Sequence, residues 1–358
     1  MFTRLAAMLA LVPALAAAAP ITPSGTQSTL AADIPALLAK NHVPSVSIAQ
    51  IKHGRIVLVA AYGEQTAGAP ATPASLYNIA SLTKPLTAET VLRLASRGRL
   101  GLDEPVYGAW TDPDIAGDER NKLLTPRLLL SHQSGFPNWR NRQTGLAFKY
   151  TPGTAMGYSG EGYEYAARFA EKKLGAPFET LVQARLFGPV GMTRTAYTAR
   201  PWFKGRIAAP ADAEGVWLEP HIAKAANAAD LVYTTPRDYA AFLLQVLKDE
   251  GLSPAIARER NRIQVSDRAA SCKGAKAATC PDDIGFGLGW QLLKFKDGTV
   301  MMHTGKDDGV FTFAWIDRRT GDGGVILTNG DNGGLLVLPI LERLGVAADY
   351  LAFLKSQI

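Results

Sequence analysis

The sequence predicts an α/β protein of the α+β type, in which the two ends of the chain form one antiparallel sheet and the middle forms an inserted helical lobe. Three observations support this prediction. Strand-like runs occur before residue 65, similar runs occur after Gly285, and residues 82–245 alternate amphipathic helical stretches with long Pro- and Gly-containing loops. Strands separated by a helical region are expected to share one sheet, with the helices packed against it.

The N-terminal elements are a helix and a β-hairpin. Residues 30–41, "LAADIPALLAKN", have apolar residues at helical spacing. Residues 44–64 contain two β-rich runs on either side of a turn at His53 and Gly54.

The C-terminal elements are strands followed by a helix. Residues 285–305 contain strand-like runs with a turn at 296–298, and further strands are predicted at 310–317 and 324–330 around a turn at 318–323. The apolar segment 335–355 is predicted to end the chain as one helix. We therefore predict a single catalytic unit over 20–358, with a sheet lobe (28–80 and 245–358) and a helical lobe (81–244).

The first 19 residues are predicted to be a signal peptide. They combine a basic residue, Arg4, with an apolar run and several small alanines, so cleavage is expected near Ala18 or Ala19 and the protein is expected in the periplasm or secreted. The alternative is a membrane anchor, but Pro13 interrupts an apolar run that is short for a bilayer span. No later segment reads as a transmembrane helix, so no stable membrane insertion is expected after cleavage.

Composition narrows the choice of partners. The chain has 358 residues, 47% of them hydrophobic, and a net charge of +6. Its basic residues are scattered rather than clustered, which disfavours nucleic-acid binding. Cys272 and Cys280 are predicted to form a short disulfide after export, and a pair of free thiols is the alternative. Two cysteines without a nearby histidine supply too few ligands for a metal site, so neither a metal nor another cofactor is expected.

Three short motifs carry candidate chemistry. Ser81 and Lys84 lie one helical turn apart, where a lysine of lowered pKa can act as the base that activates a serine. Tyr158, in the Gly-rich stretch "GYSGEGY", can relay a proton if nearby cations lower its pKa. The triplet "HTG" at 303–305 ends a predicted strand, where a backbone N–H can stabilise an oxyanion. Each has an ordinary structural alternative: a helix cap with a solvated lysine, an aromatic loop anchor and a strand end with a surface histidine.

Together and in this order, the three motifs resemble those of the penicillin-recognising serine hydrolases, which have SxxK, a tyrosine motif and a KTG-like triplet. The resemblance is closest to the branch of class C β-lactamases, D-alanyl-D-alanine carboxypeptidases, D-aminopeptidases and family VIII esterases. It extends from about Pro44 to Gly330 and includes "LLLSHQSGFP", "TPGT" and "GFGLGW".

The resemblance implies a β-lactamase/transpeptidase-like fold with the site between the lobes. It implies that Ser81 is the acylated nucleophile, Lys84 its base and Tyr158 the proton relay. It further implies that His303, Thr304, Gly305 and Lys306 form the oxyanion and substrate-binding strand, with the N–H groups of Ser81 and Lys306 as the oxyanion hole.

Two positions depart from the family pattern. Gly160 replaces the asparagine that usually ends the tyrosine motif, and His303 replaces the lysine that usually begins the triplet. Gly160 lacks a polar side chain that β-lactam and peptide substrates use. With His303, the positive charge that would meet a substrate carboxylate is absent or pH-dependent. Glu161 or Lys306 are candidates to replace these contacts. A solvated Glu161 is the simpler expectation.

Other polar and aromatic residues have structural explanations at this stage. His132 is expected to tie its loop by hydrogen bonds, and Asp307 and Asp308 to form a turn. Four aromatic residues are candidates for a substrate pocket or for the core: Phe136, Trp139, Tyr233 and Trp290.

The sequence therefore predicts an exported serine hydrolase that acts through an acyl-enzyme on esters or amides, including D-amino-acid peptides, with little or no β-lactamase activity. The expected partner is a small-molecule or peptide substrate, with cell-wall fragments among the candidates. The alternatives are a β-lactamase and a non-catalytic receptor of the same fold that binds peptidoglycan or β-lactams.

Overall fold

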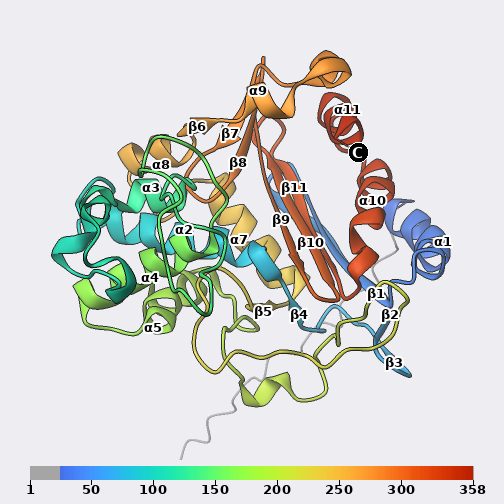
Figure 1. The fold of residues 1–358 in the computed structure, drawn as a ribbon. Helices are drawn as coiled ribbons and strands as arrows, with labels where there is room; N and C mark the ends of the chain where they lie inside the picture. The colour runs from blue at the N-terminus through green and yellow to red at the C-terminus, as the bar shows by residue number, and fades with distance from the viewer. Residues whose placement is uncertain (1–24, 358) are drawn as a thin grey trace, which may run out of the picture.

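A large antiparallel sheet forms the centre of the molecule (Figure 1). The computed structural model describes residues 25–357. Within them, nine strands pair in the order β3-β2-β1-β11-β10-β9-β8-β7-β6. The predicted signal peptide lies outside the described residues.

The two ends of the sequence meet in the middle of this sheet. The N-terminal strands are β1 (Ser45–Lys52), β2 (Arg55–Thr66) and β3 (Ala69–Pro70). The C-terminal strands are β6 (Val265–Ser266), β7 (Asp283–Phe286), β8 (Gln291–Phe295), β9 (Gly298–Asp307), β10 (Val310–Asp317) and β11 (Asp322–Thr328). β1 pairs with β11, with Val46 opposite Thr328. The predicted fold class, a sheet built from both ends with helices between them, is confirmed.

Helices cover both faces of the sheet. α1 (Gly25–Lys40), α10 (Val337–Leu344) and α11 (Ala348–Ser356) cover one face and enclose an apolar core with the inward side chains of the strands. The other face packs against α7 (Pro236–Leu247) and α2 (Thr83–Ser96), where a larger core extends into the helical lobe. The central strands are therefore buried on both faces, which explains their continuous apolar runs.

The helical lobe surrounds α2 (Figure 1). Its helices include α3 (Pro126–Leu130), α4 (Gly160–Leu174), α5 (Phe178–Val182) and α6 (Gly188–Val190), and α8 (Pro254–Arg260) packs against α2. A two-stranded sheet of β4 (Tyr77–Asn78) and β5 (Tyr233–Thr234) joins this lobe to the segment before α2. α9 (Arg268–Ser271) lies beside β7 of the large sheet.

Short helical turns complete the described chain. They are η1 (Ala80–Leu82), η2 (Val106–Gly108), η3 (Pro113–Ile115), η4 (Glu119–Leu123), the π-helical η5 (Gln183–Phe187), η6 (Pro201–Phe203), η7 (Gly274–Thr279) and η8 (Asp331–Leu336).

The prediction of one closing helix over 335–355 is wrong. The segment forms α10 and α11, separated at Gly345, whose φ of 63° ends α10 in the left-handed conformation that glycine adopts without strain. The short strands β3, β4, β5 and β6 were also not predicted, because runs of two residues carry no periodic signal.

Cys272 and Cys280 form the predicted disulfide, with an S–S distance of 2.00 Å. Across residues 25–357, no helix combines the length and the apolar character needed to cross a membrane.

Candidate active site

Ser81 lies in the tight turn η1, immediately before α2. The turn is unusual because Ala80 has a φ of 45°, a left-handed conformation that costs energy for a residue with a Cβ. Hydrogen bonds hold it in place: the Ala80 N–H donates to Asn78 Oδ1 at 2.9 Å, and Thr312 Oγ1 donates to the Ile79 carbonyl at 2.9 Å. The strained turn is thus fixed from both the small sheet and the large sheet, with Ser81 at the N-terminal end of a helix.

Lys84 is fully buried one turn later and points at Ser81. Its Nζ donates to Ser81 Oγ at 2.8 Å and to the Ala229 carbonyl at 2.9 Å. Burial lowers the pKa of Lys84 from its ordinary 10.5 to about 8, while the nearby carboxylates of Asp230 and Glu164 raise it. A substantial fraction of Lys84 is therefore neutral near pH 8 and able to accept a proton.

Tyr158 lies over Lys84, with the ammonium nitrogen 4.9 Å from the centre of the phenol ring. Burial raises the pKa of Tyr158, and its interaction with the Ser81 side chain lowers it, although 36% of the residue's surface is exposed. A relay through Tyr158 was conditional on nearby cations lowering this pKa, and that condition is not met, because burial has the largest effect and the carboxylate of Asp230 raises the pKa further. The Tyr158 phenol is therefore protonated at neutral pH.

His132 packs against the ring of Tyr158. Its ring stacks on the Tyr158 ring with 4.4 Å between centres, and its Nδ1 accepts a hydrogen bond from the Ser159 N–H at 3.1 Å. Burial, followed by the charge of Lys84, holds the pKa of His132 well below its usual range. The expectation that His132 ties its loop by a hydrogen bond is confirmed, and the tie also positions the ring of Tyr158.

The strand β9 brings the third motif against Ser81. A Cβ on Gly305 would lie 3.0 Å from the Ser81 nitrogen and would also overlap the Ile79 carbonyl, so only glycine fits. His303 is buried, and its Nδ1 contacts the Thr304 carbonyl at 2.7 Å. Because that carbonyl can only accept, Nδ1 must carry the proton. Burial, with the charge of Lys84, lowers the pKa of His303 to about 3, so this position is uncharged at neutral pH.

Trp139 explains the glycine at position 160. A Cβ on Gly160 would lie 2.8 Å from Trp139 Cη2 and 3.0 Å from the Asn138 carbonyl, so an asparagine side chain would not fit. The expectation of a solvated Glu161 is wrong: its carboxylate is buried and paired with Arg140 at 2.8 Å. Because its carboxylate is paired with Arg140, Glu161 is not available to bind a substrate.

Comparisons with known proteins match this geometry. The profile described as "Beta-lactamase" covers residues 30–345. The chain belongs to the β-lactamase family. Members of this family and its structural neighbours are serine hydrolases.

Individual relatives of this β-lactamase family protein are distant. It is 24% identical to penicillin-binding protein 4 of Amycolatopsis lactamdurans over 322 residues, which cover 82% of this chain and 83% of the relative. Solved structures that share the fold include D-amino acid amidase from Ochrobactrum anthropi (TM-score 0.71, 22% identity, 93% of this chain and 98% of that one). They also include a β-lactamase/D-alanine carboxypeptidase from Pseudomonas syringae (TM-score 0.73, 18% identity, 91% of this chain and 99% of that one).

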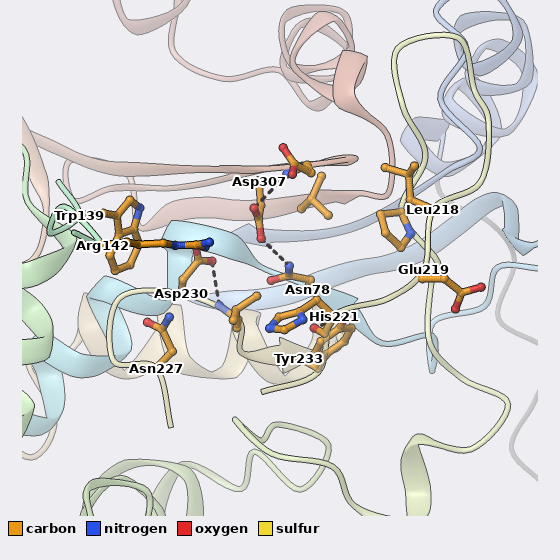
Figure 2. Close-up of a pocket in the computed structure, with 14 residues that line it drawn as sticks. Asn78, Trp139, Arg142, Leu218, Glu219, His221, Asn227, Asp230, Tyr233 and Asp307 are labelled. Carbon is orange, nitrogen blue, oxygen red and sulfur yellow. Dashed lines mark hydrogen bonds between the residues drawn. The ribbon is translucent and has the colours of Figure 1, made fainter. Parts of the chain in front are cut away.

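A pocket of about 680 Å³ opens near the turn that carries Ser81, and Asn78, which accepts the Ala80 N–H, is one of the residues that line it (Figure 2). Of the four aromatic candidates, Trp139 lines the pocket and Phe136 and Trp290 belong to the core. Tyr233 borders the pocket but is 1% exposed and also belongs to a small core cluster. Asp307 and Asp308 stand at the turn between β9 and β10, as expected, but they also line the pocket.

Sequence reasoning missed Glu164 and Asp230. Burial raises the pKa of Glu164 to about 7 and that of Asp230 to about 6, and both carboxyl groups lie near Lys84. Glu164 lies one turn beyond the tyrosine motif on α4, which was a usable signal, but Asp230 lies in a loop 146 residues after Lys84 and had none. Among residues 25–357, no group of three or more His, Cys, Asp or Glu side chains is arranged to hold a metal ion.

Proposed function

We propose that this protein is an exported serine hydrolase that forms an acyl-enzyme on Ser81 and cleaves esters or amides. The observation that carries the proposal is the 2.8 Å hydrogen bond between Ser81 Oγ and the nitrogen of a fully buried lysine. A lysine buried in this way is not a solvated surface charge, and its lowered pKa allows it to transfer a proton near neutral pH.

In the proposed reaction, Ser81 Oγ attacks the carbonyl carbon of the substrate and its proton passes to neutral Lys84. The backbone N–H groups of Ser81 and Lys306 stabilise the oxyanion of the tetrahedral intermediate. Tyr158 then passes its proton to the leaving alcohol or amine as the carbon–leaving-group bond breaks, and Lys84 returns the Ser81 proton to the Tyr158 oxygen, so both side chains end as they began. A water molecule attacks the acyl-serine, which releases the carboxylic acid and restores the Ser81 hydroxyl.

Esters and amides, including D-amino-acid peptides, are favoured over β-lactams. His303 is uncharged and Gly160 has no side chain, so the site lacks two groups expected to hold the carboxylate and amide of a β-lactam. The alternative of a non-catalytic receptor is disfavoured because a binding protein has no need of a serine, a buried base and a phenol in mutual contact.

Labelling with a fluorescent phosphonate tests the acyl-enzyme. We expect the wild-type protein to be labelled and to hydrolyse a p-nitrophenyl ester, and Ser81→Ala to lose both while folding normally by circular dichroism. A Ser81→Ala protein with undiminished hydrolysis would remove Ser81 from the mechanism. A fluorescent penicillin in parallel separates the β-lactamase and receptor alternatives, since a receptor would retain label without turnover.

Export is supported by the N-terminal sequence and by the Cys272–Cys280 disulfide, which suits an oxidising compartment. Fractionation of cells that express the full chain, followed by N-terminal sequencing of the product, tests it. Recovery of the uncleaved chain in the cytoplasm would contradict export.

A further inference from the structure

The pocket beside the nucleophile has an acidic lining. Four residues with carboxylate side chains line it, Asp230, Asp307, Asp308 and Glu219, against one lining residue that is always cationic, Arg142. The Glu219 carboxylate points away from Asp230 and Asp307 in Figure 2. Figure 2 shows Asp307 and Asp230 near Asn78, with Glu219 and His221 on the loop opposite. In a protein of net charge +6, this concentration of negative charge is a local property of the pocket.

Two residues that line the pocket lie next to the proposed catalytic groups. Asp230 follows Ala229, whose carbonyl accepts a hydrogen bond from Lys84. Asp307 comes two residues after Gly305, which packs against the Ser81 nitrogen. A substrate whose carbonyl lies at Ser81 therefore extends into a space bordered by these two carboxylates.

The two central carboxylates are held in place but keep acceptor capacity. Asp307 accepts from Asn78 Nδ2 at 3.2 Å and from the Asp308 N–H at 3.0 Å, and Asp230 accepts from the Leu231 N–H at 2.8 Å. These donors are neutral amides, so the carboxylate oxygens keep acceptor capacity for a ligand, while Lys84 offsets part of the negative charge of Asp230. Trp139 lines the pocket and is 43% exposed, so its ring adds an aromatic surface that can attract a cation.

We infer that this pocket selects substrates that carry a cationic group, such as a protonated or quaternary amine, near the scissile ester or amide. The inference rests on the proposed function and specifies its substrate class. This preference is the reverse of that of a site that binds a substrate carboxylate through a cation. His303 is uncharged and cannot supply that cation. Arg142, which points toward Asp230 in Figure 2, is the one guanidinium that works against a cationic ligand.

Two pairs of matched esters test the inference. Phenylalanine methyl ester and methyl 3-phenylpropionate differ by an amine on the acyl side. Butyrylcholine and 3,3-dimethylbutyl butyrate differ by a permanent charge on the alcohol side. We expect the wild-type kcat/KM to favour the cation in at least one pair by about tenfold, and the preference to shrink as salt is added.

Variants then locate the origin of the preference. Asp307→Asn should reduce the ratio of cationic to neutral kcat/KM several-fold, and Arg142→Gln should increase it. Asp282→Asn removes the same charge from an exposed site outside the pocket and should leave the ratio unchanged.

The outcomes separate the two proposals. If neither member of either pair is hydrolysed in a Ser81-dependent manner, the proposed function fails. If Ser81-dependent hydrolysis is present but both ratios are near one, or if Asp307→Asn and Asp282→Asn behave alike, the acidic pocket does not select cations and only this inference is overturned.

Discussion

At the scale of single residues, the environment of Lys84 decides what Ser81 can do. Spacing alone places a lysine near a serine in many helices, where it would be solvated and charged. Here the side chain is removed from water and its nitrogen is tied to Ser81 Oγ and to the Ala229 carbonyl. The cost of burying the charge is what makes the neutral amine accessible.

A pH profile tests this role. The neutral form of Lys84 becomes more populated as the pH rises through its pKa of about 8, so kcat/KM for a neutral ester should increase through that pH and level off above it. Lys84→Arg keeps the positive charge at every accessible pH and should lower kcat/KM by about 10²–10⁴-fold, with circular dichroism unchanged. A flat profile for the wild-type protein between about pH 6 and pH 10 would argue against Lys84 as the base.

At the scale of elements, the site depends on how closely β9 approaches η1. Gly305 lies at this contact, opposite Thr312 of β10, whose hydroxyl also ties down the Ile79 carbonyl. The glycine is required by the space between the strand and the turn rather than by its own backbone conformation.

Gly305→Ala is expected to push β9 away from Ser81. The added methyl group would meet the Ile79 carbonyl and lie 3.0 Å from the Ser81 nitrogen, and the displacement would separate the two backbone N–H groups of the proposed oxyanion hole. We expect kcat for an ester to fall by about 10²–10³-fold, as when one oxyanion donor is lost. Thermal unfolding provides the control, and a folded Gly305→Ala protein with near-normal kcat would place the oxyanion hole elsewhere.

At the scale of the whole molecule, a buried ion pair joins the helical lobe to the rest of the chain. Glu89 of α2 and Arg260 of α8 are both almost completely buried, with 2.9 Å between Oε1 and the guanidinium. Arg260 also pairs with Asp249, and Trp290 Nε1 donates to Glu89 at 3.4 Å. Segments 171 and 201 residues away thus converge on one helix, the same helix that begins beside Ser81.

Arg260→Met should therefore destabilise the protein, because Glu89 loses its ion-pair partner in a buried site. We expect the free energy of unfolding to fall by about 3–5 kcal/mol in denaturant titrations. The double variant Glu89→Gln/Arg260→Met removes the stranded charge and should recover part of that loss. If the double variant lost, relative to the wild-type protein, the full sum of the losses of Arg260→Met and Glu89→Gln, the stranded charge of Glu89 would not be the cause.

The sequence by itself determined the fold class and the members of the candidate site. Periodicity revealed the strands at both ends and the helices between them, and three motifs in order pointed to Ser81, Lys84, Tyr158 and the 303–306 strand, because these signals are local and each spans only a few residues.

Only the tertiary structure decided the electrostatics. Burial and contacts between residues far apart in the chain determine the charge of Lys84 and of His303. They also determine that Glu161 forms an ion pair and that Asp230 and Asp307 line the same pocket. Solvation and Coulomb interactions are set by those long-range neighbours, so no local pattern could report them.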